Sequence, residues 1–186
     1  ILSHSFFMEN TEEFFKFYKE KLNSLKYEPN ITHFKLAELE KKGKIKAIIT
    51  QNIDGLHQKA GSQNVLELHG SVLRNYCMKC GKFYNAECVF GSKGVPRCTC
   101  GGVIKPDVVL YEEVLNDEIL NKSISAIRNA DLMIVAGTSL TVYPASGLIN
   151  FYNGSKLIVI NREKTQYNRK DSLVINESLG KIFKEI

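Results

Sequence analysis

Four cysteines in two close pairs constrain this chain more than any other feature. Cys77 and Cys80 lie three positions apart, Cys98 and Cys100 lie two positions apart, and glycines adjoin both pairs. Thiolates at such spacings can point at one ion from a tight turn, and two turns together give the tetrahedral sulfur site that suits zinc. Four thiolates leave no ligand position for water, so we expect this zinc to be structural. Cys88 is interpreted as a free thiol.

The segment from Tyr76 to Ile104 contains these cysteines and shows no aliphatic periodicity. It cannot build an apolar core of its own, whereas zinc binding contributes on the order of 10 kcal/mol to folding. We therefore predict a zinc-binding module at residues 76–104, inserted into a Rossmann-like domain made of residues 1–75 and 105–186. A chain of 186 residues with 44% hydrophobic content can supply one such domain with a small insertion.

The rest of the sequence alternates short apolar runs with helical patterns. Runs typical of buried strands lie at 47–50, 65–68, 132–136, 157–160 and 173–175. One of the helical patterns starts at Asn10 and is heavily aromatic, and we expect its rings in the core. Alternation of this kind predicts an α/β fold, with a Rossmann-like, mostly parallel sheet and helices on both faces.

Polar residues follow several of these strands at their carboxyl ends, where ligands bind in open α/β sheets. The candidates of this kind are Gln51, Asn52, Asp54, His69, Gly137, Thr138, Ser139, Asn161 and Glu163. The turn at 137–139 could expose N–H groups and hydroxyls to a phosphate or ribose, and Asn161 and Glu163 could hold ribose hydroxyls. Imidazole titrates near neutrality, so His69 could act as a general base, with a structural histidine as the alternative.

Taken together, six stretches of this chain resemble the sirtuins, a family of NAD-dependent protein lysine deacylases, and most closely the bacterial type. The stretches occur in the family's order and cover nearly the whole chain. They are Gln51 to Asp54, Glu67 to Gly70, the two cysteine pairs, Lys105 to Val109, Gly137 to Ser139, and Val159 to Asn161. A chance likeness would account for one such motif, so the combination is specific.

The resemblance implies a role for each matching residue. His69 is expected to be the catalytic base, and the zinc ligands are expected to be Cys77, Cys80, Cys98 and Cys100. The residues expected to bind NAD are Gln51, Asn52, Ile53, Asp54, Gly137, Thr138, Ser139, Asn161, Arg162 and Glu163, with Ser178 or Leu179 near the adenine. The acyl-lysine peptide is expected to lie as an extra strand against Val108, Val109, Leu110 and Tyr111. The implied reaction converts acetyl-lysine and NAD, as cosubstrate, into free lysine, nicotinamide and O-acetyl-ADP-ribose.

The chain also departs from the family pattern in two places. The family's Gly-rich phosphate loop and following Asp-Phe-Arg segment are absent, and they normally precede the point where this chain begins. Because the chain starts with Ile1 and its first methionine is Met8, we expect residues upstream, and we expect these 186 residues alone to be a poor catalyst. A naturally shortened protein is the alternative. Where a desuccinylating subgroup has Tyr-x-x-Arg, this chain has Tyr18 and Lys21, which favours deacetylation, with removal of acidic acyl groups as a minor activity.

The net charge of +5 comes from lysines scattered along the chain, which is typical of a solvated surface and not of nucleic-acid binding. No apolar run approaches the roughly 20 residues of a membrane span, and no secretory signal is visible. Cysteines paired as for a metal site favour the cytoplasm over a secreted, disulfide-bonded protein. We expect acetyl-lysine proteins or peptides as partners, no nucleic acid, no membrane and a monomer.

Two alternatives stay open: a mono-ADP-ribosyl transferase on the same scaffold and a zinc-ribbon adaptor without catalysis.

Overall fold

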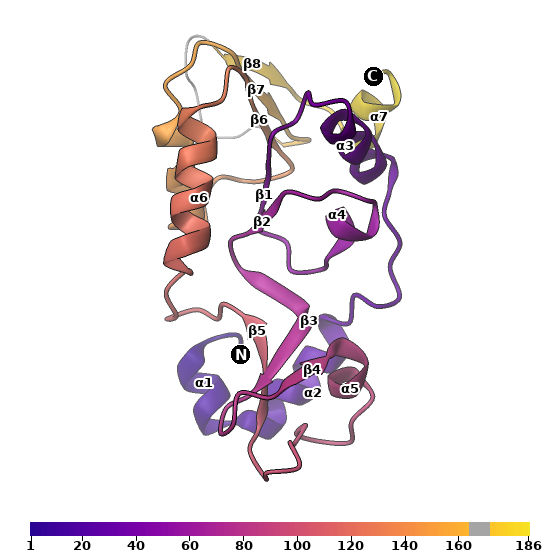
Figure 1. Cartoon of the computed structure of the whole chain (residues 1–186), viewed down its shortest axis with the longest axis vertical. Coiled ribbons are helices and arrows are strands. Elements are labelled where there is room, and N and C mark those ends of the chain that lie inside the picture. The colour runs from indigo at the N-terminus through magenta and orange to yellow at the C-terminus, as the bar shows by residue number, and fades with distance from the viewer. Residues whose placement is uncertain (164–171) are drawn as a thin grey trace. The chain divides into compact units, whose positions relative to one another are not determined.

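A computed structural model describes residues 1–163 and 172–186 of the chain (Figure 1). The chain divides into two compact units and passes between them several times. Unit 1 consists of Ile1–Glu28, Thr50–Leu56 and Glu67–Asn116, and unit 2 consists of Pro29–Ile49, His57–Leu66 and Asp117–Ile186.

Unit 1 is built around an antiparallel sheet. Its strands are β3 (Gly70–Cys77), β4 (Phe83–Asn85) and β5 (Ile104–Val108), in the order β4-β3-β5. Its helices are α1 (His4–Glu9), α2 (Thr11–Lys21) and α5 (Ala86–Phe90). Figure 1 shows α1 and α2 in indigo and violet beside the β3–β5 sheet. The sequence did not indicate this sheet, because two of the positions that β3 buries completely carry the polar residues Ser71 and Asn75.

The core of unit 1 is mainly aromatic. Phe14, Phe15 and Tyr18 of α2 are completely buried, as expected for the aromatic helix, and the rings of Phe14 and Tyr18 stack at 5.6 Å. Val89 and other buried residues between 76 and 104 belong to the same cluster. Burial of each large apolar side chain contributes roughly 1.5–3 kcal/mol. The cysteine-rich segment therefore shares a core with α1 and α2.

Strand β3 carries an irregularity that matters for the site. Its register against β5 shifts between Ser71, which pairs with Asp107, and Asn75, which pairs with Pro106. Three residues of β3 thus have no partner in β5. The buried Asn75 side chain donates from Nδ2 to the Val72 carbonyl at 3.2 Å and to the Tyr84 carbonyl at 3.3 Å. The side-chain amide thus satisfies the Val72 carbonyl, which lies in the interrupted part of the ladder.

Unit 2 contains the parallel sheet. Its strands are β6 (Met133–Ala136), β7 (Leu157–Ile160) and β8 (Ser172–Ile175), in the order β6-β7-β8 and all parallel. The helices of this unit include α3 (Ile31–Lys41), α6 (Asp117–Arg128), η1 (Ala145–Phe151) and α7 (Leu179–Lys184). Helix α3 packs against α7, and α6 packs against η1. In the view of Figure 1, α6 lies on one side of this sheet and α3 with α7 on the other.

Two short strands lie where the chain crosses between the units. β1 (Ile48–Thr50) and β2 (Val65–Glu67) form a two-stranded sheet, and α4 (Leu56–Lys59) lies between them in sequence. The Ile48 N–H donates to the Asn64 carbonyl at 2.9 Å, and the Leu68 N–H donates to the Thr50 carbonyl at 3.0 Å. From the first hydrogen bond to the second, the residue numbers increase on both strands, which is the pattern of a parallel pair. The predicted α/β class with parallel strands is confirmed, although the strands of the described residues belong to three small sheets.

None of the helices in the described part of the chain is long and apolar enough to span a bilayer.

Candidate active site and metal centre

The four paired cysteines of unit 1 form one cluster. The Sγ atoms of Cys77 and Cys100 are 3.4 Å apart, those of Cys80 and Cys98 are 3.6 Å apart, and all four lie within 4.8 Å of one another. A zinc ion with Zn–S bonds of about 2.3 Å places its four sulfurs about 3.8 Å apart. A disulfide needs about 2.05 Å, and the cysteines are free thiols. The cluster is therefore compatible with a structural zinc ion.

Two hydrogen-bond donors beside Cys98 favour its thiolate form. The Cys100 N–H donates to the Cys98 sulfur at 3.5 Å, and the Tyr84 hydroxyl donates to the same sulfur at 3.0 Å. The Cys100 N–H, followed by the Tyr84 hydroxyl, lowers the pKa of the Cys98 thiol to about 5. Cys98 is thus prepared for the charged form that binds metal.

His69 lies at the junction of β2 and β3, where three backbone segments meet. Its carbonyl accepts a hydrogen bond from the Val109 N–H at 3.0 Å. The next residue, Gly70, has a φ of +73°, and a side chain there would collide with the Asp107 carbonyl. Only glycine permits both the left-handed backbone and the close approach of β5. The sequence therefore fixes the direction in which the chain leaves His69.

The His69 ring is oriented by one hydrogen bond. Its Nδ1 lies 3.0 Å from the Gln51 carbonyl oxygen. Because a carbonyl can only accept, Nδ1 carries the proton in the neutral ring, and Nε2 keeps its lone pair. A half-buried imidazole in this tautomer can take up a proton at Nε2, which is the requirement for a general base.

The loop that contains Gln51, Asn52, Ile53 and Asp54 is held by internal hydrogen bonds of unit 1. The Asn52 N–H donates to the Thr50 hydroxyl at 3.0 Å, and the Ile53 carbonyl accepts from the Val72 N–H at 2.9 Å. Asp54 Oδ1 accepts from the Leu56 N–H at 3.0 Å. The structure thus brings this loop and His69 together through the backbones of β1, β2 and β3.

An ion-pair cluster beside His69 was not anticipated from the sequence. Arg74 Nη1 lies 2.7 Å from Glu67 Oε2, and Arg74 Nε lies 2.8 Å from Asp107 Oδ2. Partial burial alone would lower the pKa of Arg74, but the hydrogen bonds to Glu67 and Asp107 raise it. Both carboxylates belong to recognisable motifs, whereas nothing in the spacing of Arg74 indicates that it reaches them.

The stretch expected to receive a peptide is already hydrogen-bonded within unit 1. The N–H groups of Val109, Leu110 and Tyr111 donate to the His69 carbonyl, the Glu113 carboxylate and the Leu2 carbonyl, respectively. Val108 and Leu110 are buried, while the Tyr111 side chain is 67% exposed. An added strand would not find these three donors free, so a ligand would meet this stretch mainly through other groups.

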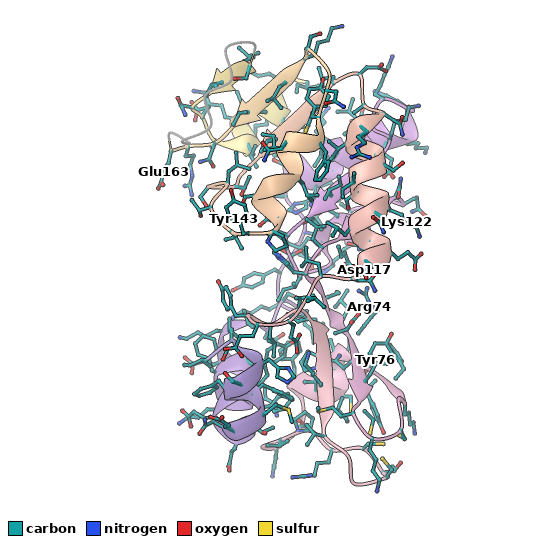
Figure 2. The ribbon with its side chains drawn as sticks, turned by 90° about the vertical axis from the view of Figure 1, so that its left-hand side faces the viewer. Arg74, Tyr76, Asp117, Lys122, Tyr143 and Glu163 are labelled. Atoms are coloured by element: carbon teal, nitrogen blue, oxygen red, sulfur yellow. The ribbon has the colours of Figure 1, made fainter. Side chains whose placement is uncertain are left out.

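In unit 2, the carboxyl ends of the parallel strands bring together the other candidates. Beyond β6, Gly137 has a φ of +63°, Thr138 Oγ1 accepts from the Leu140 N–H, and the Ser139 hydroxyl is exposed. Beyond β7, Asn161 Nδ2 donates to the Glu163 carbonyl at 3.0 Å. The residues that line this edge are Gly137, Thr138, Ser139, Asn161, Arg162 and Glu163, with Ser178 and Leu179 at the start of α7. Figure 2 labels Glu163, which projects outward from the unit.

Gly137, the residue after β6, lies close to Leu179 at the start of α7. A Cβ on Gly137 would lie 3.2 Å from a methyl carbon of Leu179. Exposed hydroxyl and amide groups at the carboxyl ends of parallel strands are the usual arrangement for holding a nucleotide.

The structure also describes Tyr18 and Lys21, which were considered for acyl preference. The Tyr18 side chain is completely buried in the aromatic core and stacks on Phe90 at 5.4 Å. Lys21 is exposed and pairs with Glu20 at 2.7 Å.

The fold is α/β, with polar groups at the carboxyl ends of the parallel strands of unit 2, and unit 1 contains His69 and a cluster of four cysteines. A sequence model described as the Sir2 family matches residues 1–144. The chain belongs to the Sir2 family.

Known proteins similar to the chain include curated bacterial relatives. It is 58% identical over 184 residues to an NAD-dependent protein deacetylase of Clostridium tetani, covering 98% of the chain and 74% of the relative. It is 57% identical to a protein of the same name from Clostridium perfringens, covering 100% of the chain and 77% of that relative.

Solved structures agree with the sequence comparison. A Sir2 protein with a p53 peptide and NAD⁺ has a TM-score of 0.92 at 39% identity, covering 100% of the chain and 80% of that protein. A Sir2 complex with an inhibitor, 2′-O-acetyl-ADP-ribose and deacetylated p53 peptide has a TM-score of 0.92 at 41% identity, covering 99% and 82%.

Proposed function

We propose that this protein removes acetyl groups from protein lysines with NAD as cosubstrate, giving nicotinamide and O-acetyl-ADP-ribose. The observation that carries the proposal is the hydrogen bond between His69 Nδ1 and the Gln51 carbonyl, which leaves Nε2 as a proton acceptor. It occurs in a chain whose relatives are named NAD-dependent protein deacetylases. Its structural neighbours include complexes with acetylated peptide and with 2′-O-acetyl-ADP-ribose.

The residues of this chain would bind and orient the reactants and move a proton. NAD supplies the ribose that accepts the acetyl group and the nicotinamide that leaves. In unit 1, His69 would take a proton from a ribose hydroxyl, and residues 51–54 would line the pocket of the nicotinamide and its ribose. In unit 2, the exposed groups at 137–139 and 161–163, with Ser178 or Leu179, would hold the remainder of the dinucleotide.

The metal would have a structural role in this proposal. Cys77, Cys80, Cys98 and Cys100 would all bind one zinc ion, which leaves no position for a reacting water. We assign residues 76–104 to a zinc-binding module and residues 1–75 and 105–186 to the NAD-binding domain. The free thiols of the cluster are consistent with a reducing compartment, so we propose the cytoplasm.

The partners would be proteins or peptides that carry acetyl-lysine. The peptide would contact Val108, Val109, Leu110 and Tyr111, with the exposed Tyr111 ring as the most accessible contact. Because the donors of this stretch are used within the unit, side-chain contacts would contribute more than strand pairing. We propose that the protein acts as a monomer and does not bind nucleic acid.

The proposal is tested by replacing the base. The full-length product of the gene carrying His69→Ala is expected to lose deacetylation by roughly 10²-fold to 10⁴-fold, as for loss of a general base. Turnover is followed as nicotinamide and O-acetyl-ADP-ribose by mass spectrometry. Zinc content and thermal unfolding should stay unchanged.

Lys16→Ala is the control, because Lys16 is an exposed residue of α2 in the same unit and lies outside the proposed site. It should keep full turnover. A His69→Ala protein that still deacetylates at a substantial fraction of the wild-type rate would exclude His69 as the base.

A further inference from the structure

The carboxylates of Glu67 and Asp107 belong to the two chain segments that meet at His69. Glu67 lies two residues before His69, and Asp107 lies two residues before Val109. The Val109 N–H donates to the His69 carbonyl at 3.0 Å, so these segments touch at the histidine itself. Arg74 binds both carboxylates, at 2.7 and 2.8 Å. One guanidinium therefore joins the segment that carries His69 to the segment that contacts it.

The β3 irregularity lets Arg74 reach both partners. Arg74 lies among the residues between Ser71 and Asn75, where the pairing with β5 shifts. Such bulges bend a strand and re-aim a side chain, and they are frequent next to active sites. The buried Asn75 side chain holds the distorted backbone through the Val72 carbonyl. Figure 2 shows Arg74 and Tyr76 along β3.

Binding of the two carboxylates, Glu67 and Asp107, favours arginine over lysine at position 74. The Glu67 side chain is only 9% exposed, and a buried carboxylate without a partner is costly. Arg74 donates from Nε to Asp107 and from Nη1 to Glu67, so one planar guanidinium group binds the two carboxylates in two different directions. Lysine offers a single point charge and cannot hold two carboxylates in a fixed mutual orientation as well.

We propose that Arg74 is a positioning residue for the reaction proposed above. It holds the 67–69 and 107–109 segments in register, so that the His69 ring stays on the Gln51 carbonyl and Nε2 stays available to the substrate. It does not touch the reacting atoms. The inference rests on the proposed function only for its kinetic consequence, since the orientation of His69 can be observed without turnover.

The test compares three variants of the full-length gene product. Two of them are Arg74→Gln and Arg74→Lys. The third is the control Arg128→Gln, which changes an exposed arginine of unit 2. We expect Arg74→Gln to lower kcat roughly 10-fold to 100-fold, the cost of a misplaced catalytic group, with KM values for NAD and peptide within about threefold of wild type. Arg74→Lys should restore part of the loss. Arg128→Gln should match wild type.

Nitrogen-15 NMR of the histidine rings gives a readout independent of activity. In the wild type, the neutral His69 ring should show the Nδ1–H tautomer, and in Arg74→Gln it should show a mixture. In a background carrying Glu67→Gln and Asp107→Asn, Arg74→Gln should have little further effect on kcat, because the partners that it orients are already neutral.

Unchanged kcat and an unchanged tautomer in Arg74→Gln would overturn the proposal. The proposal would also be overturned if the loss of turnover in Arg74→Gln were fully explained by a lower melting temperature or a lower zinc content and Arg74→Lys restored none of it. If the wild type itself does not turn over, the proposed function fails, and the tautomer of His69 in Arg74→Gln still decides whether Arg74 positions the ring.

Discussion

At His69, one hydrogen bond to a backbone carbonyl selects the tautomer, and the residue that follows selects the direction of the chain. Gly70 combines a left-handed backbone with a close approach of the Asp107 carbonyl. Each condition alone favours glycine, and together they exclude other residues without backbone movement. The position of the histidine thus depends on its neighbour as much as on its own side chain.

This dependence predicts an unusually large effect of adding one methyl group. Gly70→Ala should lower the free energy of unfolding by more than the roughly 1–2 kcal/mol that a left-handed alanine costs, because β5 must also move. Gly43→Ala is the matched control: Gly43 has a φ of +69°, and its Cβ would meet nothing within 4 Å. Urea unfolding of both variants measures the difference. Equal losses in the two proteins would contradict the role given to the close approach.

At the scale of residues, the sequence indicated the candidate site residues but not the residue that holds them in place. His69 and Gln51 could be predicted because each follows an apolar strand, and strand ends collect ligands. Arg74 could not be predicted in the same way. Its reach to Glu67 and Asp107 depends on a bulge, and a bulge that buries Asn75 leaves no periodic signal in the sequence.

At the scale of elements, the thiolate cluster and the aromatic core stabilise the same sheet. Cys77 is the last residue of β3, and Ile104 is the first of β5, so the two strands meet next to the cluster. The rings of α1 and α2 cover the buried residues of this region. The sequence predicted the metal site from spacing alone, but it did not show that distant aromatic residues supply the core of the segment.

Zinc removal should therefore disrupt more than a loop. Cys100→Ser is expected to lose most of its zinc and to weaken the β3–β5 sheet, seen as lower zinc content by mass spectrometry and reduced near-ultraviolet circular dichroism. Cys88→Ser is the control, because Cys88 lies on α5 outside the cluster. Full zinc content in Cys100→Ser, or an equal loss in Cys88→Ser, would argue against the four-cysteine assignment.

At the scale of the whole molecule, the alternation of strands and helices predicted the α/β class, and the parallel β6-β7-β8 sheet agrees with it. The division into three sheets was not predicted. Short strands such as β1 and β2 have three residues each, so periodicity in the sequence cannot show which partners they pair with. Pairing depends on contacts between distant parts of the chain.

The central claim concerns the fate of the acetyl group, and one measurement follows it directly. The full-length gene product is incubated with NAD and a peptide whose acetyl-lysine carries a ¹³C-labelled acetyl group, and all products are quantified by mass spectrometry. We predict that the label leaves the peptide and appears in O-acetyl-ADP-ribose in amounts equal to the nicotinamide released. Transfer of ADP-ribose to protein while the acetyl group stays on lysine, or no consumption of NAD by a folded, zinc-loaded protein, would contradict the account.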